Sequence, residues 1–329
     1  MLLFAFLAVS LPAFSSWWLL RGLLPTLRRR LLDLPNSRSS HSQPTPRGGG
    51  LSFVLVAAAA CPVDLFGAAF LRQSAFAGSP LAMVAIPVLA LPLAVVGFFD
   101  DRHNLLASLR YSVQLATALV LILASPLPVP LAWLAMPLLM ITVTAVINFT
   151  NFMDGLDGLV AGCMAVTIAA LAIALAAPWT MWALVGSLLG FLLWNWSPAK
   201  VFMGDVGSTF LGAVFAGLVL QASSWPEAFS YLLVATPLLG DACLCVPRRW
   251  LAGQRVFQAH RLHLFQRLHQ AGWPHARVSL TYVVATVVLA VAMLAGGWPW
   301  VFALAVLVLL LGVWLDQHVA VPFAVASKR

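Results

Sequence analysis

The chain has 329 residues, of which 62% are hydrophobic and only 9% are charged. Because an average soluble domain carries about 25% charged residues, this composition excludes an ordinary soluble protein and predicts an all-α polytopic membrane protein. The formal net charge is +8, and the placement of the basic residues is more informative than their number.

Apolar segments recur along the whole chain, and each is long enough to cross a bilayer as a helix of about 20 residues. We predict about 11 transmembrane helices, at residues 2–20, 50–71, 80–99, 110–125, 130–150, 158–177, 179–196, 208–223, 229–247, 278–296 and 299–318. The whole chain, 1–329, is then one integral membrane domain with two longer polar loops, at residues 21–48 and 248–277.

The basic residues divide unequally between the two sides of this arrangement. With eleven helices, 17 of the 18 Lys and Arg residues fall on one side, and Arg72 lies opposite. The positive-inside rule assigns the basic side to the cytoplasm. The sequence therefore predicts an outside N-terminus, a cytoplasmic C-terminus and two cytoplasmic polar loops.

Polar residues gather in four clusters, and each cluster follows an apolar segment on the predicted cytoplasmic side. The clusters occupy residues 97–104, 148–159, 200–208 and 260–263. The second of them packs two Asn, two Asp and two Gly into twelve residues, directly after an uncharged apolar run. Because all four clusters fall on one face, we expect them to converge on one cleft.

The residue types in these clusters suit a hard cation and a diphosphate. Magnesium binds through one or two carboxylates together with substrate phosphates, and Arg binds phosphate in bidentate fashion. The candidate metal ligands are Asp205, Asn151 and one of Asp100, Asp101, Asp154 and Asp157. The candidate diphosphate-binding residues are Arg110, Arg261, His260, His263 and Arg47. A metal and cations around a phosphoryl group predict phosphoryl transfer.

Each cluster also has a purely structural interpretation. Asp100 and Asp101 could cap a helix end, and Asp154 and Asp157 could lie in a solvated loop. The Arg- and His-rich loop could contact anionic lipid headgroups. The coincidence of all four clusters on one face favours the functional interpretation.

The remaining polar residues receive plainer interpretations. Asp241 lies inside the ninth predicted helix, where helix packing or proton relay is conceivable and a catalytic role is not expected. Asp64 and Asp316 are expected to face water near the ends of their helices. The histidines expected to be surface residues are His103, His269 and His275.

Five motifs in the sequence resemble those of a known family. They are Asp33–His41, Pro44–Gly50, Gly97–Asn104, Asn148–Gly158 and Phe202–Ser208. In this order they resemble the polyprenyl-phosphate N-acetylhexosamine-1-phosphate transferases, or glycosyltransferase family 4. This superfamily includes the phospho-MurNAc-pentapeptide transferase of peptidoglycan synthesis, and the resemblance covers nearly the whole chain.

The resemblance implies a reaction at the cytoplasmic face of the bacterial inner membrane. A phosphate oxygen of undecaprenyl phosphate attacks the β-phosphorus of a UDP-N-acetylhexosamine, and UMP leaves. The implied cofactor is Mg²⁺, or Mn²⁺ in its place, bound by Asp205 and Asn151. The implied partners are the two substrates and membrane lipid, without nucleic acid, and a homodimer is compatible with the family.

The resemblance also implies roles for individual residues. Asp100 and Asp101 would lie beside the diphosphate, where one would deprotonate the lipid phosphate. The residues that would hold the diphosphate are Arg110, His260, Arg261 and His263. The residues that would recognise the nucleotide are Asp157, Asp154, Asn148 and Phe202. Asn104 would read the sugar together with the second long loop.

One departure from the peptidoglycan branch bears on the substrate. That branch has three consecutive His residues in its last loop, whereas this chain has His260 and His263 separated by Arg261 and Leu262. The longer pattern resembles the subgroup that initiates O-antigen, so lipopolysaccharide biosynthesis is expected rather than peptidoglycan synthesis. The alternatives from other classes are a transporter of lipid-linked sugars and a membrane scaffold that recruits glycosyltransferases.

Overall fold

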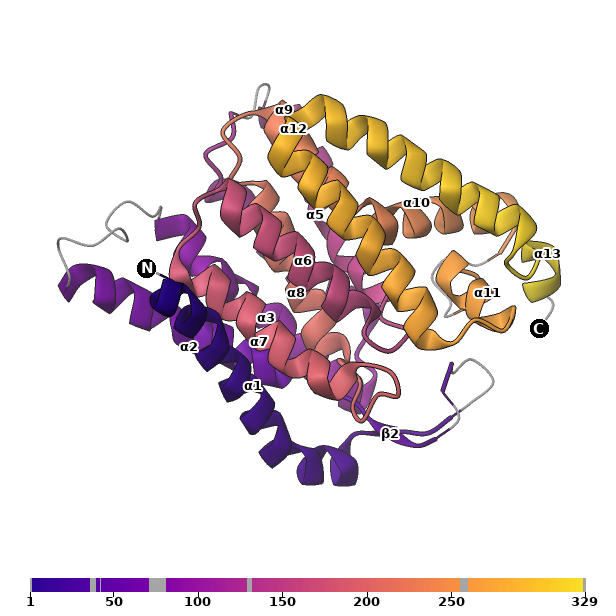
Figure 1. Ribbon diagram of the computed structural model, residues 1–329, viewed down its shortest axis with the longest axis horizontal. Helices are drawn as coiled ribbons and strands as arrows, with labels where there is room; N and C mark the ends of the chain where they lie inside the picture. The colour runs from indigo at the N-terminus through magenta and orange to yellow at the C-terminus, as the bar shows by residue number, and fades with distance from the viewer. Residues whose placement is uncertain are drawn as a thin grey trace.

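The computed structural model describes residues 2–35, 40–41, 43–70, 81–128, 132–254 and 260–327. Helices dominate these residues, and Figure 1 shows most of them packed side by side in one bundle. The helices are α1 (Leu2–Arg30), α2 (Leu51–Phe70), α3 (Leu81–His103), α4 (Ala107–Leu123), α5 (Ala132–Phe152), α6 (Leu159–Ala174), α7 (Trp179–Asn195), α8 (Asp205–Val219), α9 (Trp225–Val234), α10 (Thr236–Leu251), α11 (Leu264–Gln270), α12 (His275–His318) and α13 (Phe323–Ala326). The predicted all-α class is confirmed.

The first polar loop is shorter than predicted because α1 continues to Arg30 instead of ending near residue 20. After it, β1 (Leu32–Asp33) pairs antiparallel with β2 (Thr45–Pro46). The backbone N–H of Phe202 donates to the carbonyl of Pro46 over 2.8 Å, which ties this hairpin to the segment before α8. The motif residues 36–39 and residue 42 lie outside the described residues, as do Arg72, Lys328 and Arg329.

Helix α8 lies at the centre of the bundle. Its residues from Val206 to Leu218 are all buried, and it packs against α3, α5 and α6. Three glycines along it, Gly207, Gly212 and Gly217, would place any added Cβ about 3 Å or less from a neighbouring helix. Small residues of this kind let helix backbones approach closely, and here they bring the first turn of α8 to the ends of α3 and α5.

The last three predicted helices differ in shape or continuity from the expectation. The ninth is not one straight helix, because α9 and α10 meet at Ala235 with an 85° bend. The tenth and eleventh predicted helices are the two arms of α12, which Figure 1 shows folding back beside each other. The reversal occurs at Gly297, whose φ of 66° and ψ of −156° are open to glycine but costly for other residues.

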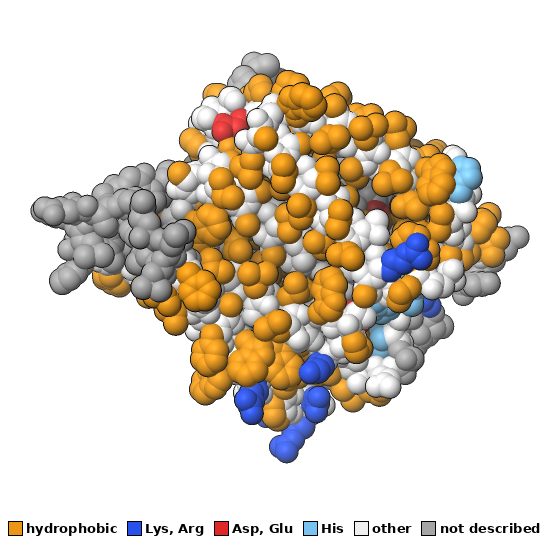
Figure 2. All heavy atoms as spheres, viewed as in Figure 1, with side chains coloured by type: hydrophobic (Ala, Val, Ile, Leu, Met, Phe, Trp, Pro, Cys, Tyr) orange, Lys and Arg blue, Asp and Glu red, His pale blue; other side chains and the backbone are white. Residues whose placement is uncertain are grey.

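The outer surface of the described residues is largely apolar. Phe66 and Leu193 are 76% and 71% exposed, and Figure 2 shows hydrophobic side chains over most of one face. Four described helices are long and apolar enough to cross a bilayer, or five if α9 and α10 count as one span. The protein is therefore a multi-pass membrane protein. The helices that are long enough by themselves account for four or five of the eleven predicted spans.

Candidate active site

A cavity of about 670 Å³ opens between the ends of α3, α4, α5 and α8 and the segment before α11. Its walls combine apolar residues, among them Val96, Ile141 and Val246, with charged and amide side chains. Seven of the predicted site residues line it: Asp100, Arg110, Asn148, Asn151, Asp205, His260 and His263. The structure therefore brings the ends of three predicted helices and the last polar loop together in one site.

Arg110 joins two carboxylates at the mouth of this cavity. Its Nη1 lies 2.5 Å from Oδ2 of Asp100 and 4.0 Å from Oδ2 of Asp205. The other oxygen of Asp100 accepts the backbone N–H of Leu105 over 2.7 Å, which ties α3 to the segment before α4. Asp100 thus has a structural contact of its own and also lines the cavity.

Asp101 lies deeper than its neighbour. Its side chain is 2% exposed, and its Oδ2 accepts the backbone N–H of Val206 over 3.4 Å at the start of α8. Nη1 of Arg47 lies 3.9 Å from its other oxygen. Asp101 does not line the cavity and lies instead at the N-terminal turn of α8, whose partial positive charge favours a carboxylate there.

The α3–α8 crossing depends on Gly97, one turn before Asp100. A Cβ at this position would lie 2.5 Å from the carbonyl carbon and oxygen of Asp205. Only a glycine lets the two backbones approach this closely, and the approach sets the separation of Asp100 and Asp205.

The two asparagines of α5 have different surroundings. The side-chain amides of Asn148 and Gln114 exchange two hydrogen bonds, of 2.7 and 3.1 Å, which tie α5 to α4. Oδ1 of Asn151 accepts the hydroxyl of Ser208 over 2.7 Å, which ties α5 to α8. The amide of Asn148 is thus engaged by Gln114 of α4, and that of Asn151 by Ser208 of α8.

Asp154 and Asp157 lie in the turn after α5 and outside the cavity lining. Burial, together with the charges of Asp101 and Asp157, raises the pKa of Asp154 to about 7. Burial also opposes ionisation of Asp157, but a 3.1 Å ion pair with Nδ1 of His275 outweighs it and lowers the pKa of that carboxyl. His275, expected to be a surface residue, is instead only 13% exposed in its side chain and belongs to this turn.

Besides Arg47, Asp101, Asp154 and Asp157, three further predicted site residues do not line the cavity. The ring of Phe202 packs edge-on against His41 with centroids 4.9 Å apart, next to the β1–β2 hairpin. Asn104 is exposed just past α3 and has a positive φ of 50°. Arg261 is half-buried between His260 and His263, and its carbonyl accepts a hydrogen bond from the side chain of Gln270.

His260 and His263 stack on each other at the wall of the cavity, with ring centroids 4.9 Å apart. Burial, with the neighbouring charges of His263 and Arg249, lowers the pKa of His260 to about 3. Burial opposes the charge of His263 too, but its ion pair with Asp241 is stronger and raises the pKa of His263 to about 9. The wall therefore carries one neutral and one cationic imidazole at neutral pH.

The donor set fits a divalent cation. Asp205 repels Asp100, Asp101 and Asp154 electrostatically, and the nearest cation that the described residues give it is Arg110, at 4.0 Å. This excess of negative charge around carboxylate and amide oxygens is what Mg²⁺ compensates in phosphate-binding sites. Asp205 and Asn151 both line the cavity, so they are the residues that would hold the ion.

Comparisons with known proteins agree with this geometry. Residues 83–223 match the pattern of the family described as glycosyl transferase family 4. The chain is 34% identical over 292 residues to the phospho-N-acetylmuramoyl-pentapeptide-transferase of Desulforudis audaxviator, covering 77% of this chain and 84% of that protein. The chain belongs to the polyprenyl-phosphate N-acetylhexosamine-1-phosphate transferase superfamily. It is a sugar-phosphate transferase.

Other relatives of this family carry different substrate names. The chain is 32% identical over 318 residues to the decaprenyl-phosphate N-acetylglucosaminephosphotransferase of Mycobacterium leprae, covering 83% of this chain and 79% of that protein. It is 28% identical over 267 residues to a probable undecaprenyl-phosphate N-acetylglucosaminyl 1-phosphate transferase of Bacillus subtilis, covering 74% of this chain and 71% of that protein. The relatives thus agree on the class of reaction and differ in the sugar.

Proposed function

We propose that this enzyme transfers an N-acetylhexosamine-1-phosphate from a UDP-sugar to undecaprenyl phosphate with Mg²⁺ as cofactor. The observation that supports this most is the cavity of about 670 Å³, whose lining combines carboxylates, an Arg and two His with apolar residues of the surrounding helices. A lipid phosphate needs both kinds of wall, because its chain stays in the bilayer while its phosphate meets a water-soluble donor.

In the proposed reaction an oxygen of the lipid phosphate forms a bond to the β-phosphorus of the donor. The bond from that phosphorus to the bridging oxygen breaks, and the oxygen leaves with UMP. Asp100 lines the cavity and Asp101 does not, so Asp100 is the better placed of the two to accept a proton from the lipid phosphate. Bound Mg²⁺ would neutralise charge on the diphosphate.

The basic side chains of the cavity have complementary tasks in this proposal. Arg110 can turn its guanidinium from Asp100 toward a diphosphate oxygen without leaving the site, because it is 40% exposed. His263 offers a cationic N–H elsewhere in the lining of the same cavity, next to His260. Two cations from different elements that face the same bound anion would help to orient it for in-line displacement.

We assign the nucleotide to the neighbouring turn, where Asp157 and Phe202 lie outside the cavity. Asp157 is held by His275 and by the backbone N–H of Ala199 over 3.1 Å, so its carboxylate is preoriented. Phe202 offers a partly exposed ring next to the same loop. A uridine there would leave its diphosphate pointing toward Asp205.

We further propose eleven spans, an outside N-terminus and a cytoplasmic C-terminus in the bacterial inner membrane. Helices α1, α3 and α10 all end in basic residues, which supports a cytoplasmic location for these ends and for the cavity beside them. Five further apolar helices have 15–17 residues in their described parts, and α12 contributes two arms. Helices of this length cross a bilayer where the protein thins it locally.

The sequence of the second long polar loop is the basis for the sugar that we propose. Because His260 and His263 are separated by Arg261 and Leu262, we propose a donor of the O-antigen-initiating type over the peptidoglycan precursor. Membranes containing the protein, supplied with undecaprenyl phosphate and a panel of UDP-N-acetylhexosamines, should yield one dominant lipid product by mass. A product carrying the muramoyl pentapeptide would reverse this assignment in favour of peptidoglycan synthesis.

The reaction class is tested by UMP release with Mg²⁺. We expect Asp205→Asn to lower UMP release about 100-fold or more, because the ligand charge that holds the cation is lost. Glu227→Gln is the matched control, since it removes one carboxylate charge in α9, where its partners are Ser223 and Tyr231. Full activity of Asp205→Asn would remove the metal assignment, and substrate counterflow without any product would indicate a transporter.

A further inference from the structure

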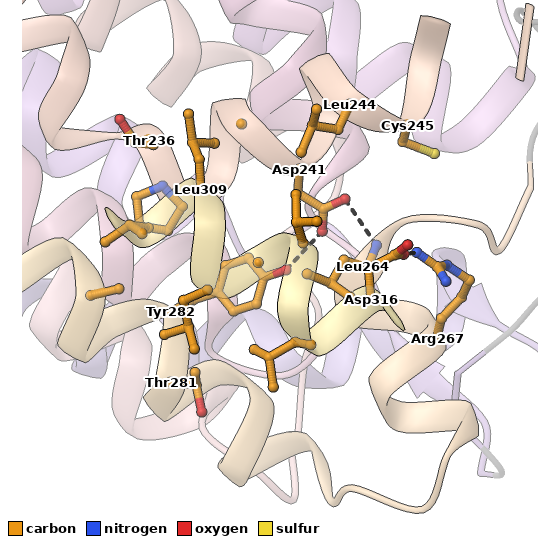
Figure 3. A pocket seen from close by; sticks show the side chains of 18 of the residues that line it. Thr236, Asp241, Leu244, Cys245, Leu264, Arg267, Thr281, Tyr282, Leu309 and Asp316 are labelled. Carbon is orange, nitrogen blue, oxygen red and sulfur yellow. Dashed lines mark hydrogen bonds and ion pairs between the residues drawn. The ribbon is translucent and has the colours of Figure 1, made fainter. Parts of the chain in front are cut away.

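Asp241 is a buried carboxylate that the proposed reaction does not use. It lies in α10 with 3% of its side chain exposed, and it borders a second cavity of about 390 Å³ between α10, α11 and α12. Figure 3 shows residues that line this cavity, with the hydroxyl of Tyr282 directed at the carboxylate of Asp241. A buried acid in a membrane-spanning helix is costly unless it is paired, so its partners decide what it does.

The partners of Asp241 come from two parts of the chain, the start of α11 and the first arm of α12. One carboxylate oxygen accepts the backbone N–H of Leu264 over 2.9 Å and lies 3.3 Å from Nδ1 of His263. The other accepts the backbone N–H of Phe265 over 3.1 Å and the hydroxyl of Tyr282 over 2.8 Å. Figure 3 marks the bonds to Leu264 and Tyr282. Both oxygens of Asp241 are thus occupied by protein groups. Asp241 therefore positions these groups and does not bind substrate itself.

The contact with His263 carries the consequence for the active site. Nδ1 of this ring is held by Asp241, and its side chain is only 2% exposed. Its Nε2 is buried and has no hydrogen-bond partner among the described residues. The same residue lines the cavity of the candidate active site. A buried ring nitrogen without a partner, on the wall of a site built for an anion, indicates a ligand that supplies the partner.

Other contacts fix the plane of the His263 ring. It stacks between His260 and Phe265, with centroid distances of 4.9 and 5.7 Å. The side chain of Gln266 accepts the backbone N–H of His263 over 3.3 Å, which holds the residue at the start of α11. The ring can therefore neither rotate away from Asp241 nor leave the cavity wall without breaking several contacts.

We propose that Asp241 is a positioning residue that keeps His263 as an imidazolium with its Nε2–H directed at an anionic oxygen in the active-site cavity. Asp241 itself touches no substrate and acts through His263, as an orienting carboxylate does for a histidine in other enzymes. The inference rests on the proposed function, because that function makes the anion a phosphate oxygen. It adds a residue that none of the sequence motifs contains.

The charges around His263 support the cationic form. From α10 it faces Asp241 and the thiol of Cys245, whose Sγ and the ring nitrogens of His260 and His263 all lie within 4.8 Å of one another. From the preceding loop it faces His260, which is neutral because its pKa is lowered to about 3. From α12, Tyr282 reaches it through Asp241. Burial opposes the charge of His263, but Asp241 and, after it, Cys245 favour it, and together they raise the pKa of His263 to about 9.

The test is the pH dependence of UMP release by the full-length protein and by its Asp241→Asn variant. In the wild type, UMP release should fall at alkaline pH as His263 loses its proton, and this alkaline limb of the pH profile should lie near pH 9. Without the carboxylate it should move toward the ordinary histidine value of about 6.5, so the variant should be about 30-fold slower at pH 8 and nearly as fast as the wild type at pH 6. If UMP release by the variant recovers at low pH, the loss at pH 8 is due to deprotonation of His263 and not to unfolding, because an unfolded protein would be inactive at both pH values.

The matched control is Asp64→Asn. Asp64 is also buried, and it accepts the backbone N–H and the hydroxyl of Thr180 over 2.9 and 2.8 Å, remote from the site. We expect this variant to lower the Tm without moving the alkaline limb. Asp241→Asn with a uniform loss at every pH, or with an unchanged limb, would contradict the positioning role and leave a structural one.

A second measurement does not depend on the reaction. The wild type and Asp241→Asn can be grown with ring-¹³C-histidine, and His263 can be identified among the seven His residues by its loss in His263→Gln. The ring should titrate near pH 9 in the wild type and about two units lower in the variant. If the titration shifts as expected while no UMP is formed from any donor, the positioning role stands and the proposed function fails. If the ring titrates near 6.5 in both proteins, the positioning role itself is wrong.

Discussion

At the scale of single residues, Arg110 is the most consequential cation of the site, because one guanidinium faces two carboxylates, Asp100 and Asp205. We expect Arg110→Gln to lower UMP release about 100-fold, since the two acids would then repel each other and the diphosphate would lose a bidentate partner. Arg110→Lys should recover little of this loss, because an ammonium cannot reproduce the planar fork.

Arg102→Gln is the control for this prediction. Arg102 lies at the exposed end of α3, two residues after Asp100, and removing it changes the net charge by the same amount. UMP release should stay within about twofold of the wild type, as expected for an exposed charge outside a site. Equal losses in Arg102→Gln and Arg110→Gln would show that general surface charge, and not the bridge between the two acids, is what matters.

At the scale of helices, the site depends on how closely α3 passes α8. We expect Gly97→Ala to reduce both the Tm and UMP release, because its Cβ would lie 2.5 Å from the carbonyl of Asp205. Separating the two backbones costs on the order of 1–3 kcal/mol and also moves Asp205 away from Asp100. Gly22→Ala in α1 is the control, since its Cβ would meet nothing within 4 Å. Wild-type values for Gly97→Ala would show that the crossing is looser than the structure has it.

The sequence predicts most helices of this bundle, because an apolar segment in a bilayer can satisfy its backbone hydrogen bonds by itself only as a helix. It does not predict the 85° bend at Ala235, which tertiary packing rather than hydrophobicity determines. The predicted first helix is ten residues too short, because a basic segment after an apolar run predicts a loop, whereas Arg is compatible with a helix that continues beyond the membrane.

For the site, the sequence clusters identify the side chains whose helices end on one face, and seven of these line a common cavity. They do not identify partners that lie far away in the chain. Asp157 meets His275, and Asp64 and Asp316, expected to face water, instead bond Thr180 and two Arg residues. Such pairs follow from how helices dock, so an acid inside an apolar helix is the only sequence signal they leave.

At the scale of the whole molecule, the stability of the fold should depend on pH through the Asp241–His263 pair. His263 has a raised pKa of about 9 in the folded protein and an ordinary value of about 6.5 in the unfolded chain. Its contribution is therefore fully present below about pH 6.5 and is lost as the pH rises through about 9. By linkage it amounts to about 3 kcal/mol for this buried pair.

The prediction is a decline of the Tm in detergent between pH 6.5 and pH 9 that is steeper in the wild type than in Asp241→Asn. The comparison between the two proteins is needed, because Asp154 also titrates in this window with a pKa of about 7. That raised carboxyl pKa makes protonation stabilising, so it too lowers the Tm as pH rises, but by the same amount in both proteins. Subtracting one pH curve from the other leaves the pair alone. Parallel curves would mean that the carboxylate at position 241 does not hold the proton on His263, and the loop before α11 would then be fastened by the backbone bonds of Leu264 and Phe265 instead.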